Sequence, residues 1–532
     1  MAEEVFTRKA TGVVREASWF QALMSNIAQL QIGLPGFYVF LTAWMFPGWD
    51  VPTVFLLSLI PVTTHAILLS IMTSQFPRSG GDYVWASRIL PPYIVISTIF
   101  ALQVIGALVT PGFIDWGIYG GLGTVFTCLG ISLNNPAISS ISTTLQDPNV
   151  RFLIVSILIW VFAIVNIKSL KLSLKWISVM AILGTIAGLV SGFTLLFSSN
   201  QYFITQWNNL FGSYLTYDQV INTAISNGYE YIPIGLGTFG TLFGLIACTY
   251  EMNIGYAASI SFAGEIKSAR RSIPIATLAC VALGAVVLFI MCWAQQNVVG
   301  QKFIYSSMYL FYSKPELWTV PAPADPFLYA VIATGLNPIL AVIIPLGLLS
   351  GCLGLVAVSY IVSSRYWLAF SFDRFLPTFF SKVDKKHHTP WVSILFFGII
   401  YEIGLAFSCY YAAGVVYIGL PYRSISLLNN ALIAAAVLLF PVIAKSLYEH
   451  ADVVKRHKVL TLLSAVITFA FFAFAAINVV IHPEYGGPPN IGVWIFMIIL
   501  LLLGPIIWLL SKIYWSRRGL DTSLVYKEVP PE

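Results

Sequence analysis

The side chains with the clearest chemical potential lie in the middle of an apolar stretch, FGTLFGLIACTYEMNIGYAA, which spans residues 239–258. The polar groups in the middle of this stretch and the glycine that follows them are Thr249, Tyr250, Glu251, Asn253 and Gly255. A carboxylate that faced lipid here would cost at least about 2.5 kcal/mol. We therefore expect Glu251 to contact a substrate, to gate a pathway or to exchange a proton. A hydrogen bond that only serves helix packing is the alternative.

A second apolar stretch, SNIAQLQIGLPGF, shows the same combination near the amino terminus. Its amide side chains and its helix-breaking residues are Asn26, Gln29, Gln31, Gly33, Pro35 and Gly36. The pattern predicts an unwound helix, which in hydrocarbon leaves backbone amides and carbonyls unpaired at several kcal/mol each. Such a break persists where a cavity, an ion or a substrate accepts those groups. A pair of kinks that only aids helix packing is the alternative.

Two polar, glycine-interrupted spans at corresponding places in two halves of a chain predict a binding site between them. The half-helix ends offer amides to a carboxylate and carbonyls to an ammonium group or a cation, and such a site suits a zwitterion. Close approach of the backbone would require that the glycines stay small. The residues that we expect to bind the substrate are Gln29, Gln31, Ile32, Gly33, Thr249, Tyr250, Glu251, Asn253 and Gly255.

The composition places both stretches in a membrane protein. Of the 532 residues, 58% are hydrophobic and 9% are charged, whereas soluble domains carry about 25% charged residues. The mean hydropathy is +0.83. Apolar runs long enough to cross a bilayer predict an all-α polytopic protein with twelve transmembrane helices. The predicted spans are residues 19–44, 52–75, 93–124, 152–167, 173–198, 236–261, 274–297, 339–364, 391–412, 423–444, 460–481 and 490–511.

The basic residues predict the orientation of these spans. If alternate loops face opposite sides, only Arg151, Lys302, Lys314 and Arg423 fall on one side, which leaves 24 of the 28 Lys and Arg on the other. Cytoplasmic loops are enriched in Lys and Arg, so we expect a multi-pass protein of the cell membrane with both termini cytoplasmic. Patches for nucleic acid or lipid are the alternative for these basic loops. Topogenic charge is favoured because every internal loop shows the bias, and no nucleic acid partner is expected.

Four further side chains within the spans are candidates for gating or ion coupling beside Glu251, and they are Glu402, His65, Ser350 and Ser359. Glu402 lies deep in the ninth span, where a structural pair is the favoured interpretation. His65 is expected to be a hydrogen-bonded core histidine. The serines carry oxygen ligands of the kind that suit sodium, although such serines more often bond to their own helix. The six cysteines have no paired spacing, and we expect no metal site and no cofactor.

Three loop segments carry a resemblance to a known family. FPRSGGDYVWASRIL follows the second span, AGEIKSARRSIPIA the sixth and SFDRFLPTFFSKVDKKHHTP the eighth, with a weaker echo in NIKSLKLSLKW. These segments resemble the signatures of the amino acid–polyamine–organocation permeases and fall at the expected places along nearly the whole chain. The resemblance implies a five-plus-five inverted repeat of the leucine-transporter type, in which helices 1 and 6 are interrupted.

The resemblance also implies a division of the chain. The expected parts are a cytoplasmic amino-terminal segment over residues 1–18, a ten-helix transport core over residues 19–445, two appended helices over residues 446–511 and a cytoplasmic tail over residues 512–532. In the loops, Pro77, Gly80 and Gly81 predict a tight turn. Glu265 can pair with Lys267 or with an arginine from a facing loop. Gating is one interpretation of these loops, and a role in folding and topology is the other.

The chain also departs from the family pattern. Gln31, Ile32 and Gly33 stand where relatives usually carry G-x-G. Many relatives place a glutamate two residues after the glycine of the sixth span, where this chain has Ala257. Some proton-coupled relatives carry a lysine in the fifth span, but residues 177–199 contain no charge. A proton and sodium therefore both stay open as the coupling ion.

These observations predict a secondary active transporter that moves an amino acid or a related small amine by alternating access. A polyamine or organocation exchanger is the alternative within transport, and Glu251 keeps it open. A transport-incompetent membrane sensor and an intramembrane enzyme are the alternatives from other classes. The enzyme is disfavoured because His387 and His388 lie in a basic loop without an intramembrane partner. The expected partners are the substrate, the bilayer and a co-transported ion.

Overall fold

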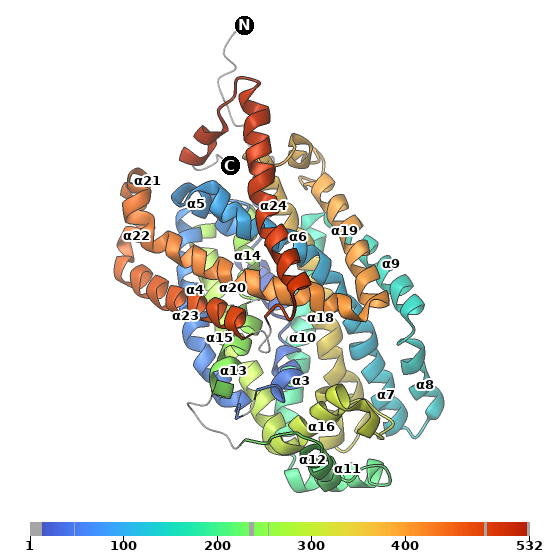
Figure 1. The fold of residues 1–532 in the computed structure, drawn as a ribbon. Helices are drawn as coiled ribbons and strands as arrows, with labels where there is room; N and C mark the ends of the chain where they lie inside the picture. Colours follow the sequence, from blue (N-terminus) through green and yellow to red (C-terminus); the bar gives the residue numbers. More distant parts are fainter. Residues whose placement is uncertain (1–12, 47, 233–238, 254, 483–486, 529–532) are drawn as a thin grey trace.

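The computed structural model describes residues 13–46, 48–232, 239–253, 255–482 and 487–528. This part of the chain is a bundle of helices, many of which run between two opposite ends of the molecule (Figure 1). Within it there is no β-strand, and two isolated bridges pair Ala17 with Ile266 and Ser79 with Phe262. The predicted all-α class is therefore confirmed for the described residues.

Ten helical runs in the described residues are long and apolar enough to cross a membrane, and each falls on one of the predicted spans. They are α4 (Val51–Gln75), α6 (Pro92–Trp116) with η1 (Gly117–Leu122) and α7 (Gly123–Ser132), α9 (Pro148–Lys168), α10 (Leu170–Leu195), α15 (Ala269–Gln295) with η3 (Gln296–Gly300) and α16 (Gln301–Ser313), α18 (Pro338–Phe372), α19 (Trp391–Tyr410), α20 (Ala412–Ile443), α23 (Lys458–Ile481) and α24 (Ile491–Ser516). The multi-pass character of the protein follows from them.

The other two predicted spans, residues 19–44 and 236–261, are interrupted. The first consists of α1 (Trp19–Leu30), α2 (Pro35–Tyr38) and α3 (Phe40–Ala43), and the second contains α13 (Phe239–Asn253) and α14 (Ala258–Ser261). None of these pieces is long enough to cross a bilayer alone. The count of twelve spans therefore stays a prediction that depends on these two segments.

Short polar side chains begin many of the long helices. Ser18 and Gln21 form a capping box at the start of α1, and Asp50 accepts from the backbone N–H of Thr53 at the start of α4. Ser169 caps α10 and Asn337 caps α18 in the same way. A cap satisfies one of the backbone donors that a helix start leaves unpaired, so these residues place the helix starts where the structure has them.

Short helices mark the two ends of the bundle. The α11 end carries α11 (Asn200–Phe211), α12 (Tyr217–Ser226) and α16 (Figure 1). α17 (Pro326–Ala333) packs against α11. The α5 end carries α5 (Gly81–Ile89), α21 (Lys445–Glu449) and α22 (Asp452–Arg456) (Figure 1). The remaining elements are α8 (Pro136–Thr144), η2 (Ala263–Glu265), η4 (Pro315–Leu317), η5 (Thr378–Ser381) and η7 (Thr522–Lys527).

The interrupted helix α1 lies at the centre of the packing. It contacts α10, α15 and α18 along its length, and it contacts α14. Around this group, α15 packs against α4, α10 against α18 and α19 against both α6 and α9. The two carboxy-terminal helices lie outside: α23 packs against α4 and α20, and α24 packs against α6. The break in α1 is consequently enclosed by other helices.

We predict that the α5 end is cytoplasmic and the α11 end is external. Lys385 lies in the exposed loop after η5, on the side where Arg88 of α5 pairs with Asp373, and Asn209 is exposed on α11. Single cysteines at these two positions, in a background whose six buried cysteines are replaced by alanine, test the orientation. An impermeant thiol reagent applied to intact cells should label the Asn209 variant alone. Labelling of both variants, or of the Lys385 variant alone, would contradict the predicted topology.

Candidate functional site

The first helix break begins at Gln31. This residue has a left-handed backbone (φ 57°, ψ 43°), which is uncommon for a residue other than glycine. Its N–H still bonds to the carbonyl of Ala28 at 3.3 Å, and its own carbonyl accepts from the N–H of Leu34 at 2.7 Å. Pro35 then begins α2. Within the described residues, the N–H groups of Ile32 and Gly33 form no backbone hydrogen bond.

Gly33 is constrained by the two helices that enclose the break. A Cβ atom at this position would lie 2.7 Å from the carbonyl oxygen of Gly184 on α10 and 2.9 Å from the Cα of Gly347 on α18. Along the same face of α18, Gly351 lies against Gln31 and Gly354 lies against Ala28. The close approach that we predicted for Gly33 therefore exists, but the structure places helix backbones there. Helix packing alone forbids a larger residue at this position.

The second break contacts the first. α13 ends at Asn253 and α14 begins at Ala258. A Cβ atom on Gly255 would lie 2.1 Å from the Cα of Leu30, so the backbone of the second break touches the last residue of α1. The buried side chain of Asn26 also accepts, at 2.8 Å, the N–H of Ser259 on α14. The two interrupted segments therefore meet, as the paired pattern predicts.

Both interrupted segments carry buried polar atoms that have no partner among the described residues. Among the described residues, no hydrogen-bond partner is present for Asn26 Nδ2, Gln29 Oε1, Gln31 Oε1, Thr249 Oγ1 and Ser259 Oγ. A buried polar group left unsatisfied costs about 1–3 kcal/mol, so most such groups in proteins are paired. A small polar ligand or a bound water could satisfy this group of donors and acceptors.

The structure does not describe all the side chains of the predicted site. Tyr250, Glu251 and Asn253 belong to α13, but their side chains are not among the described residues. Their predicted contact with the substrate therefore stays a prediction. Thr249 and Ile32 are described, and both are buried.

His65 is a coupling candidate whose side chain bonds to a residue of the second break. It lies on α4, and its Nδ1 is 2.7 Å from the hydroxyl of Tyr256, which follows Gly255. Both side chains are buried, and the imidazole ring packs against Phe472 of α23. His65 is thus a hydrogen-bonded core histidine, as expected, and its partner belongs to the second break.

The remaining coupling candidates bond elsewhere. Ser156 of α9 donates to Glu402 at 2.7 Å, which joins α9 to α19 at the edge of the bundle (Figure 1). The hydroxyls of Ser350 and Ser359 donate to carbonyls of their own helix, at 3.2 and 2.8 Å. Ser350 also lies beside Gly184 and therefore borders the first break. Among the described residues, neither Glu402 nor Ser359 contacts a break in this way.

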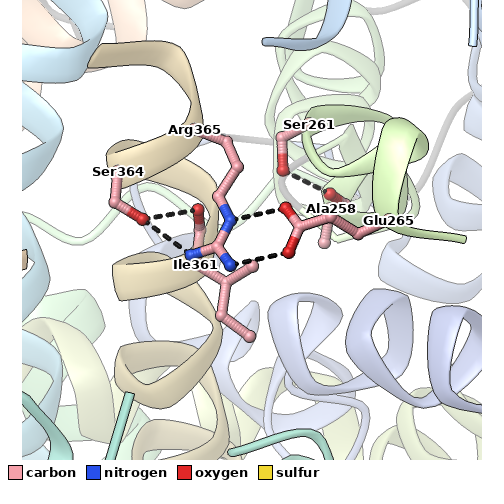
Figure 2. A network of polar contacts seen from close by, with 6 residues as sticks. All are labelled: Ala258, Ser261, Glu265, Ile361, Ser364 and Arg365. Carbon is pink, nitrogen blue, oxygen red and sulfur yellow. Dashed lines mark hydrogen bonds and ion pairs between the residues drawn. The ribbon is translucent and has the colours of Figure 1, made fainter. Parts of the chain in front are cut away.

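A buried ion pair lies between the breaks and the α5 end. Arg365 of α18 donates from Nε and Nη2 to the two carboxylate oxygens of Glu265, both at 2.8 Å (Figure 2). Both side chains are 1% exposed. Ser364 accepts a further bond from Arg365 Nη1 at 3.0 Å. The bidentate geometry is the strongest form of such a pair.

Sequence reasoning did not identify Arg365. Glu265 was expected to pair with Lys267 or with an arginine from a facing loop, and its partner in the structure is an arginine within a long helix. Arg365 directly follows the predicted span 339–364, so it resembled an ordinary topogenic charge. The only signal was the position of a guanidinium group beside a long apolar run.

Backbone pairing closes the same region. Ala17 exchanges hydrogen bonds with Glu265 and Lys267 at 2.9 and 2.8 Å, and the N–H of Gly80 donates to Ser261 at 2.8 Å. The Tyr366 hydroxyl donates to Asp82 of α5 at 2.5 Å. Burial raises the pKa of Asp82, and the hydrogen bond from Tyr366 opposes this shift. Segments that are distant in sequence are therefore joined at the α5 end.

Two cavities lie on the opposite side of the breaks, toward the α11 end. Their volumes are about 450 and 370 Å³, and their shared lining residues are Tyr38, Leu41, Trp116, Tyr119 and Tyr312. Asp325 and Arg151 add charge to the smaller cavity. Burial raises the pKa of Asp325, while a hydrogen bond from Thr124 lowers it. These lining residues were not singled out from the sequence, because aromatic residues are common throughout the chain.

A family model for amino acid permeases matches residues 18–508. The matched range contains both breaks, the Glu265–Arg365 pair and the two cavities.

Removing one partner of the buried ion pair should destabilise the protein strongly. Arg365→Ala leaves the carboxylate of Glu265 buried and unpaired, a change that typically costs about 3–5 kcal/mol. We expect a clearly lower melting temperature in detergent. The double variant Glu265→Arg/Arg365→Glu swaps the two charges, so it should recover part of the loss. Lys267→Ala, which removes an exposed charge beside Glu265, serves as the control and should leave the melting temperature unchanged. Equal melting temperatures for Arg365→Ala and the parent would contradict the importance of this pair.

Proposed function

The chain belongs to the amino acid permease family, as its loop motifs predicted, and we propose that it carries an α-amino acid or a similar small amine across the cell membrane by alternating access. The substrate binds where the two helix breaks meet. The observation that supports this proposal most directly is that the two contacting segments carry five buried polar atoms without a partner among the described residues. Family membership implies a transporter and not an enzyme.

The chemistry of the break suits a zwitterion. The N–H groups of Ile32 and Gly33 can donate to a carboxylate, and the oxygens of Gln29, Gln31 and Thr249 can accept from an ammonium group. These donors and acceptors come from both interrupted segments, and they are withdrawn from bulk water. A ligand that satisfies them recovers the free energy that unpaired buried groups forfeit.

The contacts at the two ends favour alternating access. The cavities lie toward the α11 end, whereas the Glu265–Arg365 pair and the backbone bonds of Ala17 and Gly80 seal the α5 end. We infer that this arrangement is a state with access from the external side. The buried ion pair must separate for the substrate to leave toward the cytoplasm. The loop motifs would then act as a gate, which is the first of the two roles considered for them.

Helix packing supports the inverted repeat. In a five-plus-five arrangement, helix n of the first half corresponds to helix n+5 of the second. Four such pairs are in contact, namely α1 with α13 and α14, α4 with α15, α6 with α18 and α9 with α19. On this basis we propose the ten-helix core over residues 19–445, the appended helices over residues 446–511, and cytoplasmic segments over residues 1–18 and 512–532.

The coupling ion belongs to the same proposal. His65 can carry a proton. Protonation would change its hydrogen bond to Tyr256, which belongs to the second break. Ser350 borders the first break and keeps oxygen lone pairs that could contact sodium. We favour His65 because its hydrogen bond reaches a residue of the break directly.

Thr249→Val tests the location of the site. The Thr249 hydroxyl has no protein partner among the described residues, so the ligand-free protein should melt at nearly the same temperature after the change. The stabilisation by a bound amino acid, which follows RT ln(1 + [L]/Kd), should decrease. Thr73→Val is a matched control, because Thr73 Oγ1 is also buried without a partner but lies near the end of α4. Equal ligand-induced shifts in the parent and both variants would place the site elsewhere.

Truncated ligands test the substrate class in the same thermal-shift assay. For an amino acid that stabilises the parent, removal of the carboxylate or of the amine should each cost on the order of 1–3 kcal/mol in binding, because charged partners then stay unmet. A diamine that stabilises the protein as well as the best amino acid would contradict the zwitterion and favour the polyamine alternative.

Glu251→Gln tests the ionisable group of the second break. The substitution should change the pH dependence or the substrate range of uptake in proteoliposomes, because an ionisable group at that depth needs a partner. Glu402→Gln is the control, since Glu402 bonds to Ser156 at the edge of the bundle and should leave the pH profile unchanged. If the Glu251 variant transports like the parent at every pH and for every substrate, Glu251 has a packing role.

A further inference from the structure

A basic cavity of about 590 Å³ lies at the α5 end, away from the helix breaks. Its basic lining comes from four separate parts of the chain: Arg15, Arg78, Arg270 with Arg271, and His450. Among the described lining residues there is no Asp or Glu. Glu449 and Asp452 are close in sequence but do not line the cavity, and Asp452 lies 3.9 Å from Lys455. Arg15 and Arg78 also take part in other interactions, so any ligand-binding role of the cavity depends on Arg270 and Arg271.

The walls of this cavity are fixed by specific hydrogen bonds. Ser74 at the end of α4 donates to the carbonyl of Arg270 at 3.1 Å, which holds α4 against the start of α15. Gln75 donates to the carbonyl of His450 at 3.4 Å and accepts from the N–H of Val453 at 2.9 Å. The second of these bonds is well within hydrogen-bond range and ties α4 to α22. The basic residues consequently surround one defined space.

The start of α15 lacks the negative charge that helix starts usually carry. Its first turn contains no acidic residue, and Ser268, with a left-handed backbone (φ 51°), gives no side-chain cap. Arg270 and Arg271 stand there instead, and neither forms an ion pair with a described residue. Cations at a helix amino terminus are unfavourable because the helix dipole is positive at that end. A bound anion would offset both the dipole and the repulsion between Arg270 and Arg271.

We propose that this cavity binds a phosphate group, carried either by an anionic phospholipid or by a free phosphate-bearing solute. Arginine presents a planar fork of donors that matches phosphate in a bidentate manner. The cavity lies where two candidate spans end or begin, at Gln75 and Ala269, which is the level of the membrane surface. Basic pockets at such positions bind lipid headgroups in other membrane proteins.

Topogenic charge alone does not account for this arrangement. Orientation requires only that basic residues lie on one side of the membrane. It does not require that residues from four segments converge on one cavity without a lining carboxylate. The neighbours of the cavity residues also take part in closing the α5 end, since Ala17 bonds to Lys267 and Gly80 bonds to Ser261. A phosphate held in the cavity would therefore stabilise the closed state.

Melting temperatures of the full-length protein in neutral detergent test this site. The probes are phosphatidylglycerol added to the micelles, phosphatidylcholine at the same concentration, and inorganic phosphate against chloride at equal ionic strength. We expect phosphatidylglycerol or inorganic phosphate to raise the melting temperature of the parent. Phosphatidylcholine and chloride are the negative controls and should leave it unchanged. A response to inorganic phosphate identifies the free solute as sufficient, and a response to phosphatidylglycerol alone identifies the lipid.

Paired variants separate this site from general surface charge. Arg270→Ala/Arg271→Ala should raise the half-saturating concentration of the active probe roughly tenfold or more, because charge-assisted hydrogen bonds are lost. Lys385→Ala/Lys386→Ala removes two exposed cations from another loop and should leave the half-saturating concentration unchanged. If the alanine pair does not fold, Arg270→Lys/Arg271→Lys keeps the charge, removes the forks and should still weaken binding. The proposal is overturned if neither probe stabilises the parent, or if the Arg270/Arg271 variants that fold respond like the parent and the control.

Discussion

A backbone that is interrupted inside a bilayer must be enclosed by protein, and the packing of this molecule depends on that constraint. α1 stops at Leu30 and α2 starts at Pro35, so the intervening residues cannot face lipid. Gly347, Gly351 and Gly354 let α18 lie directly against this interruption, and Gly184 lets α10 approach it from another direction. The same small residues that allow close packing leave little room, so some polar atoms of the break are buried without a partner among the described residues.

The region between the breaks and the α5 end combines two kinds of contact. The Glu265–Arg365 pair is buried and bidentate, and removing a single partner is far more costly than exposing both to water. The backbone bonds of Ala17 and Gly80 lie in loops and can open without unfolding a helix. In the proposed transport cycle, the ion pair would make closure specific, whereas the loops would supply the movement. Substrate binding would shift this balance only as far as its affinity differs between the two states.

The appended carboxy-terminal helices contact the parts that the proposed cycle uses. α23 packs along α4, and its Phe472 lies against His65, whose partner Tyr256 belongs to the second break. α21 contributes to the basic cavity beside the start of α15. A phosphate bound there would join the end of α4, the start of α15 and the appended helices into one unit. Lipid composition could then influence the proposed closed state without any contact with the substrate.

Local composition determined much of this structure. Hydropathy predicted ten helices at the places where they occur, and the glycine and proline patterns predicted both interruptions, because these properties depend on residues that are neighbours in the chain. The loop motifs identified the family for the same reason. The sequence also singled out Glu251 and Asn253, and the contact of their side chains with the substrate stays a prediction.

Tertiary structure alone decided which groups meet. Glu265 and Arg365 are 100 residues apart, and Asn26 and Ser259 are 233 apart, so no local pattern specifies either partner. The need for glycine at position 33 was expected from a ligand, yet it comes from the backbones of α10 and α18. Pairings of this kind depend on how helices from distant parts of the chain pack, and that packing is set by the shapes of their surfaces together.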